Sequence, residues 1–209
     1  MAKNSNPPTL NERVYRVLAD DLIAGRYAPG VKLVIAKIAE EVGASTMPVR
    51  EALKRLASEN ALTMEPNRSV CVPVMSAEEL DELTDIRLLL EGRAAELAAD
   101  NITRKELQSL KVCQDAIDLA IKKADAGALL SANQKFHFGI YEAARSGLLL
   151  RHIRSLWMRA GPMFHEPDAD DVFDESVSAS FEAHHQIMDA LECRDGAAAK
   201  KAVQVHSKK

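Results

Sequence analysis

The sequence predicts a mainly α protein, in which an N-terminal winged helix-turn-helix is followed by an all-α bundle of six helices. Apolar residues recur at helical spacing through most of the chain, and the composition is 47% hydrophobic but only 4% aromatic. Short β-prone runs occur only between residues 62 and 74. Because a new helix-start signal follows them directly, we expect two domains, residues 1–75 and 76–209.

Charge is divided unevenly between these two expected domains. Residues 1–75 hold 10 Lys and Arg against 8 Asp and Glu, a balance of +2. Residues 76–209 hold 17 against 23, a balance of −6, within a net charge of −4. A mildly basic front half is typical of a small DNA-reading domain, and the acidic remainder indicates a domain with another task.

Nothing in the composition favours a secreted or membrane protein. The three cysteines, Cys71, Cys113 and Cys193, are far apart and odd in number, which argues against both a disulfide framework and a metal motif. The polar start of the chain has no apolar signal region, and no apolar run reaches the length of a membrane span. We therefore expect a cytoplasmic protein without a membrane partner.

The first domain begins with a capped helix and continues as a helix pair. Residues 9–12 (TLNE) have capping-box spacing, and the helix that they open should end at Gly25. Residues 35–56 (IAKIAEEVGASTMPVREALKRL) predict two helices around a turn at Gly43, with hydroxyls at the tip of the second helix and Arg50 on its outer face. This is the layout of a helix-turn-helix DNA reader, although many such pairs are only core.

A β-hairpin is predicted directly after the helix pair. The runs 62–64 and 70–74 are β-prone and lie on either side of a polar turn, residues 65–69. A hairpin at this point is the wing of a winged helix. Arg68 at its tip could reach a phosphate or the minor groove; the alternative is a solvated turn arginine.

The second domain contains helical signals alone. Capping boxes begin at Ser76 and Thr103, and Asp125 can cap the helix that comes next. We expect helices over residues 77–100, 104–124, 126–146, 148–159, 175–192 and from 196 to near the C-terminus. Together they make a compact six-helix bundle.

All six histidines lie in the second domain. Asn133 and His137 are four residues apart and share a helical face, His184 and His185 lie on a later helix, and His206 lies on the last one. Imidazoles from three antiparallel helices can converge inside a bundle and hold a divalent metal ion such as Zn or Ni. The alternative is a set of separate histidines, and of His184 and His185 only one can face a given centre.

Both halves of the chain resemble a known family. Residues 22–74, with the segments IAEEVGAS and PVREAL, are similar to the winged-helix domain of GntR-family bacterial regulators. The second half resembles the FCD effector domain of the FadR-type subfamily, in the segments IRLLLEGRAAELAA (86–99), NQKFHFGIYEAA (133–144), LLRHIRSLWMRAGP (149–162) and HHQIMDAL (184–191). The resemblance implies a homodimeric transcriptional repressor that binds a near-palindromic double-stranded DNA operator.

The resemblance also assigns DNA contacts by position. The tip of the recognition helix and the wing would face the duplex, through Ser45, Thr46, Met47, Arg50, Asn67 and Arg68. Arg50 can bond a guanine edge or a phosphate, and the hydroxyls can bond phosphate oxygens at the helix N-terminus. Many relatives have Arg where this chain has Thr46, and Gly where it has Ser69, so binding should be weaker and less salt-dependent here.

For the second domain, the resemblance implies a metal centre with an organic-acid effector at or beside it. Metal-binding relatives use one carboxylate and three histidines, and the matching positions are Asn133, His137, His185 and His206. A neutral amide oxygen at Asn133 is a weaker ligand than a carboxylate, so an anionic ligand would help to complete the shell. Arg87 matches a family arginine that can pair with a small organic acid; its alternative partner is Glu91, four residues on.

Two other functions fit the same residues. Three histidines around a metal ion with an open position can activate water, which would suit a metal-dependent enzyme acting on a small carboxylate. Against this, no Glu is placed as a general base, and a winged helix has no role in such an enzyme. In the other alternative the chain binds DNA and its pocket is only structural. We expect a metabolite-responsive regulator and not an enzyme.

Overall fold

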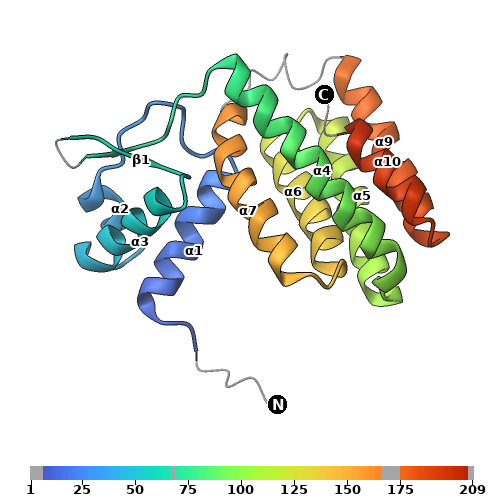
Figure 1. The fold of residues 1–209 in the computed structure, drawn as a ribbon, viewed down its shortest axis with the longest axis horizontal. Helices are drawn as coiled ribbons and strands as arrows, with labels where there is room; N and C mark the ends of the chain where they lie inside the picture. The colour runs from blue at the N-terminus through green and yellow to red at the C-terminus, as the bar shows by residue number, and fades with distance from the viewer. Residues whose placement is uncertain (1–6, 67–68, 166–174, 207–209) are drawn as a thin grey trace. The chain divides into compact units, whose positions relative to one another are not determined.

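The computed structural model is mainly helical and confirms the predicted fold class (Figure 1). It describes residues 7–66, 69–165 and 175–206, with side chains in the last range from residue 183 onward. The chain divides into two compact units. The first comprises the chain up to Met75 together with Trp157–His165, and the second comprises the remainder. None of the described helices has the length and apolarity needed to cross a lipid bilayer.

The first unit holds the helices of a winged helix. Helix α1 (Leu10–Ile23) and helix α2 (Ile35–Glu41) both pack against α3 (Thr46–Ser58). Gly43, at φ +62°, makes the turn between α2 and α3, a backbone conformation that glycine adopts without strain. The buried side chains recur at helical spacing on α1 and α3, and include Val14, Leu18, Leu22, Val49, Leu53 and Leu56.

The wing is a short antiparallel hairpin. Strand β1 (Thr63–Met64) pairs with β2 (Val70–Cys71), which is a shorter ladder than the predicted runs. A segment at residues 30–33 pairs with the other edge of β2, since the N–H of Leu33 donates to the carbonyl oxygen of Val70 at 2.8 Å. The sequence did not predict this third edge, because residues 28–30 (APG) are a turn signal and α2 begins soon after them.

The first unit also includes a segment from much later in the chain. The last turn of α7 (Gly147–Ala160) and the 3-10 helix η1 (Gly161–Phe164) belong to it, although the sequence analysis assigned them to the second domain. Gly161 lies against the end of α1, where an added Cβ would stand 2.1 Å from the carbonyl oxygen of Leu22. The glycine therefore does more than stop a helix, because only a residue without a side chain permits this approach.

The second unit contains six α-helices within the described ranges, as predicted. Besides α7, which continues into the first unit, these are α4 (Ala77–Asn101), α5 (Arg104–Lys123), α6 (Ala126–Ala143), α9 (Glu175–Glu192) and α10 (Gly196–His206). Figure 1 shows α4, α5, α6, α9 and α10 lying alongside one another, with α10 packed on α4 and α9. The predicted caps at Ser76, Thr103 and Asp125 are confirmed, because each side chain accepts the N–H three residues on.

Helix α10 is fixed on α4 near both of its ends. Just before α10, Arg194 donates to carbonyl oxygens at the C-terminal end of α4, the closest at 2.9 Å. Near the other end, Gln204 Nε2 donates to the carbonyl oxygen of Leu88 at 3.2 Å. These bonds set the position of α10 along α4, and hence the position of its last residue, His206.

The carboxylate of Glu106 both caps α5 and ties it to the end of α6. It accepts from the N–H of Thr103 at 3.0 Å and from Arg145 Nη2 at 2.7 Å. The hydrogen bonds from Thr103, followed by the contact with Arg145, lower the pKa of Glu106 to about 2. A carboxyl with a depressed folded-state pKa stabilises the fold above its unfolded pKa of about 4.3, and it loses that contribution as the pH falls through the folded value.

We therefore expect Glu106→Gln to lower the free energy of unfolding by about 1 kcal/mol at neutral pH and by almost nothing near pH 2. The expected loss is small because a third of the Glu106 side chain is exposed and solvent screens its charge. Gln preserves the cap, so the difference isolates the charge. Urea unfolding across this pH range checks it, with the exposed Glu142→Gln as control. A wild-type advantage that does not shrink on acidification would contradict it.

Candidate functional site

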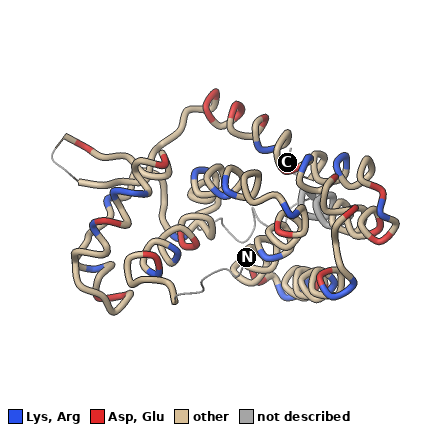
Figure 2. The backbone as a smooth tube through the Cα atoms, turned by 60° about the horizontal axis from the view of Figure 1, so that its bottom comes forward, with Lys and Arg blue, Asp and Glu red and all other residues tan. Residues whose placement is uncertain are grey.

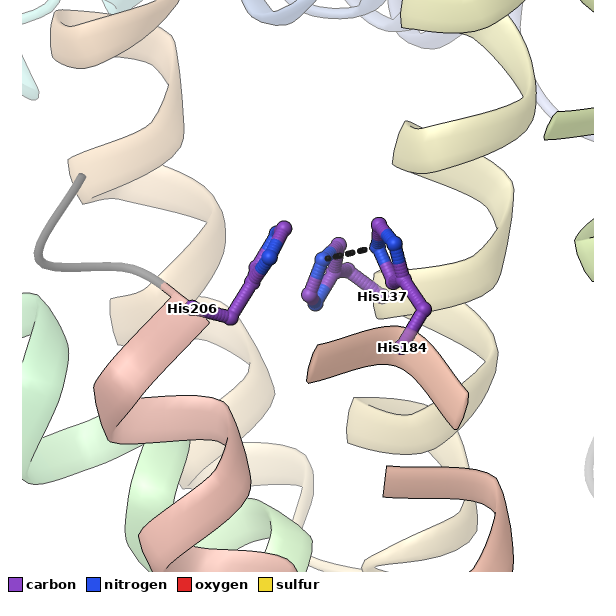
Figure 3. A group of neighbouring side chains, drawn as sticks. All are labelled: His137, His184 and His206. Carbon is purple, nitrogen blue, oxygen red and sulfur yellow. Dashed lines mark hydrogen bonds between the residues drawn. The ribbon is translucent and has the colours of Figure 1, made fainter. Parts of the chain in front are cut away.

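Three histidine side chains converge inside the second unit (Figure 3). His137 comes from α6, His184 from α9 and His206 from the end of α10, and one ring nitrogen from each lies within 4.8 Å of the others. The Nε2 atoms of His137 and His184 are 3.3 Å apart. The rings of His137 and His206 are stacked, with centroids 4.6 Å apart. Nitrogens this close together can bind one shared ion. We call these three residues the histidine group.

The structure brings His184 to this group, whereas His185 was the predicted ligand. His184 is 3% exposed, but His185 lies on the exposed side of α9. The cause is helical spacing, because His184 lies three and seven residues before Ile187 and Leu191, which are both fully buried. The apolar residues of the segment IMDAL (187–191) therefore indicate, from the sequence alone, that His184 and not His185 faces the core. In the candidate site, His184 replaces His185.

Asn133 also faces the histidine group. Its Oδ1 atom lies 2.9 Å from His184 Nε2. The amide oxygen thus stands beside the ring nitrogens, four residues before His137 on the same face of α6. Three imidazole nitrogens and one oxygen are a donor set that zinc accepts in a tetrahedral site.

Burial keeps the two inner imidazoles neutral. It lowers the pKa of His137 well below its ordinary value, with smaller contributions from the nearby His206 and His184. Burial and then the charge of His206 lower the pKa of His184 to about 2. A neutral imidazole offers a lone pair, which is the form that binds a metal. The residues present therefore fit a divalent cation such as Zn²⁺ or Ni²⁺.

A buried chain of polar side chains leads away from His137. The Tyr141 hydroxyl lies 3.3 Å from His137 Nδ1 and 2.8 Å from Glu91 Oε2. The fully buried Glu91 accepts from Arg87 Nε at 2.8 Å. Arg87 thus has the ion pair that the sequence analysis gave as the alternative to an organic acid. Tyr141 was not among the predicted site residues, although its place four residues after His137 puts both on one helical face.

The predicted DNA-contacting residues of α3 lie together on the surface of the first unit. Ser45, Thr46, Met47 and Arg50 are all exposed, Met47 to 66%. Ser45 holds the N-cap position of α3, yet its side chain makes no capping hydrogen bond. Its hydroxyl is therefore not used to cap the helix. Asn67 and Arg68, the predicted contacts on the wing, lie outside the described residues.

Arg50 and Arg55 differ in their surroundings, although both lie on the outer side of α3. The Arg55 guanidinium lies 3.6 Å from the centroid of the Tyr15 ring and donates to Glu12 and Glu59, each at 3.0 Å. The contacts with Tyr15 and Glu12 fasten α3 to α1. No ion pair holds Arg50 in the part of the chain that the structure describes. Of the two, Arg50 is the one whose charge no described ion pair compensates.

Arg50 also borders a hollow on the first unit. The hollow measures about 380 Å³, and its walls are Ile35, Arg50, Leu53, Lys54, Met64 and Val70. It is therefore an apolar depression between α3 and the wing with two cations in its lining. Figure 2 shows basic and acidic residues interspersed along both units.

Family models match both parts of the chain. The model for bacterial regulatory proteins of the gntR family matches residues 10–72. The model for the FCD domain matches residues 82–209, which is more than half of the chain.

Individual proteins match over nearly the whole length. The HTH-type transcriptional regulator McbR of Escherichia coli (strain K12) is 33% identical over 90% of this chain and 84% of its own length. A probable D-xylose utilization operon transcriptional repressor of Paenarthrobacter nicotinovorans is 27% identical over 98% and 88%. The solved structure of E. coli McbR/YncC superposes with a TM-score of 0.87 at 30% identity, covering 96% of this chain and 94% of that one. A putative GntR regulator from Rhodococcus sp. RHA1 gives 0.72 at 25% identity, covering 95% and 93%.

Proposed function

Because the chain belongs to the GntR family of bacterial regulatory proteins and carries an FCD domain, we propose that it is a metabolite-responsive repressor. In this proposal residues 1–75 read DNA, and residues 76–209 dimerise and bind a divalent metal ion together with a small organic acid. Membership of the family makes the chain a DNA-binding transcriptional regulator and not an enzyme, as expected from the sequence. The observation that carries the proposal is the convergence of His137, His184 and His206.

The histidine group supports the metal and the organic acid together. His137, His184 and His206 would hold the ion, with the amide oxygen of Asn133 beside them. Imidazoles bind a metal ion in their neutral form, so three of them and a neutral amide would leave the charge of a divalent cation uncompensated, and a buried charge favours an anionic partner. When bound, the metal supplies an attachment point for a carboxylate. Arg87 is 12% exposed and could share its guanidinium between Glu91 and that carboxylate.

The exposed tip of α3 supports the DNA half of the proposal. Two copies of the chain would place two α3 helices in successive major grooves of a near-palindromic operator. The repressing direction is supported by the Paenarthrobacter relative, whose name describes a repressor. An organic acid would release the operator only if it binds the DNA-free arrangement of the dimer more tightly than the DNA-bound one.

The test starts from an operator selected out of random duplexes by the purified protein. Fluorescence anisotropy then measures operator affinity with zinc present and with each member of an organic-acid library. We expect at least one acid to weaken operator binding by about tenfold or more. Operator binding that survives Arg50→Ala and Arg68→Ala together would refute the DNA contacts. A library that changes neither operator affinity nor melting temperature would favour a purely structural pocket.

A further inference from the structure

Tyr141 connects the histidine group to the buried ion pair of Arg87 and Glu91, and the proposed function does not use it. We infer that the Tyr141 hydroxyl is a positioning group that holds His137 with its proton on Nδ1 and its lone pair on Nε2, facing the other two histidines. The inference deepens the proposed metal site and rests on it for one of its two tests.

The direction of the hydrogen bonds follows from counting protons. Tyr141 has one hydroxyl proton, and its hydroxyl lies 2.8 Å from Glu91 Oε2 and 3.3 Å from His137 Nδ1. The carboxylate oxygen is the closer and stronger acceptor, and it has no proton to give while Glu91 is paired with Arg87. The hydroxyl proton therefore goes to Glu91. The remaining contact is a hydrogen bond only if Nδ1 carries a proton and donates it to the phenol oxygen.

The opposite tautomer is disfavoured at this position. With its proton on Nε2, His137 would bring the lone pair of Nδ1 against the lone pair of the Tyr141 oxygen. His137 is 1% exposed, so water does not compensate for that lost hydrogen bond. The tautomer that satisfies both groups is the one that leaves Nε2 free, 3.3 Å from His184 Nε2. The Glu91 carboxylate, linked to His137 through the Tyr141 hydroxyl, also makes His137 Nε2 a stronger electron-pair donor to a cation.

His137 is supported in this way and His184 is not. In the described structure the Nδ1 atom of His184 is buried and has no hydrogen-bond partner. Its Nε2 atom lies 2.9 Å from Asn133 Oδ1, an acceptor that draws the proton of His184 to Nε2. Of these two histidines, His137 is therefore the one whose Nε2 lone pair is prepared for an ion before the ion arrives.

Zinc affinity tests the inference through Tyr141→Phe, which removes only the hydroxyl and keeps the ring that packs on Phe138. Competition with a chromophoric chelator should give a zinc dissociation constant about 10–100-fold higher than that of the wild type. The matched control is Tyr15→Phe, because the Tyr15 hydroxyl makes the same kind of bond to Glu59 at 2.5 Å in the first unit. The control should bind zinc as the wild type does. Equal affinity in Tyr141→Phe would overturn the inference.

The second test needs no metal. Long-range ¹H–¹⁵N spectra of the metal-free protein, recorded above the ordinary histidine pKa, report which ring nitrogen carries the proton. The His137 signals, identified with His137→Gln, should show the proton on Nδ1 in the wild type and a shift toward Nε2 in Tyr141→Phe. A wild-type proton on Nε2 would overturn the inference. If the wild type binds no zinc, the proposed metal site fails, and these spectra still decide the role of Tyr141.

Discussion

His184→Ala is expected to lower the affinity of the protein for zinc by about a hundredfold or more, and His185→Ala to leave it unchanged. Removing His184 leaves two imidazoles in the group. It also removes the ring nitrogen that lies 2.9 Å from Asn133 Oδ1. His185 projects from the next position on α9, on its exposed side. The two variants remove the same chemical group from adjacent residues, so each controls for the other.

Metal content and thermal stability both measure this difference. Elemental analysis of protein purified without chelator should find about one Zn or Ni ion per chain in the wild type and in His185→Ala, but little in His184→Ala or His137→Ala. Zinc at a hundred times its dissociation constant should stabilise the wild type against unfolding by about 2.7 kcal/mol. This stabilisation should be absent in His184→Ala and His137→Ala. If the wild type contains no metal and His137→Ala does not change its metal content, the histidine group is structural only.

Much of the fold could be predicted because its signals are local. The capping residues Ser76, Thr103 and Asp125 mark helix starts in the sequence and cap those helices in the structure. Gly43 predicted the turn between α2 and α3, where the backbone has positive φ. Each of these signals involves residues only a few positions apart, so a single sequence contains all of the information.

The features that escaped prediction depend on residues distant in the sequence. The approach of Gly161 to Leu22 joins segments about 140 residues apart, and Gly161-Pro162 alone signals only the end of a helix. The third edge of the wing depends on Leu33 pairing with Val70, across two intervening helices. Such contacts are set by packing of the whole unit and leave no local pattern.

The histidine group could be predicted in part, because it depends both on local spacing and on long-range packing. Three helices that carry histidines were evident from the sequence, but their convergence depends on how α6, α9 and α10 pack. The choice of His184 over His185 was available locally, through the buried positions of Ile187 and Leu191. Of the link from His137 through Tyr141 to Glu91, only the first part could be predicted from the sequence. Tyr141 shares a helical face with His137, but Glu91 lies on another helix.

Arg50→Ala is expected to weaken operator binding by about 10–100-fold, equivalent to about 1–3 kcal/mol. Arg50 is exposed on α3, three residues after Met47, and it borders the hollow between α3 and the wing. The salt dependence of binding identifies the contact. If Arg50 neutralises a phosphate, the slope of log affinity against log salt should decrease by about 1 and all duplexes should lose equally. If it reads a guanine, the slope should change little and discrimination at one base pair should disappear.

Lys111→Ala is the matched control for this loss of one positive charge. Lys111 lies in the second unit, is 55% exposed and pairs with Glu192 at 2.9 Å, an exposed ion pair of small energetic value. Its removal should leave operator affinity and salt slope as in the wild type. Because Thr46 already lacks the cation that many relatives have there, Arg50 is the remaining charged side chain among the predicted contacts of α3. An Arg50→Ala protein that matches Lys111→Ala in affinity, slope and discrimination would therefore remove α3 from the predicted base-reading surface.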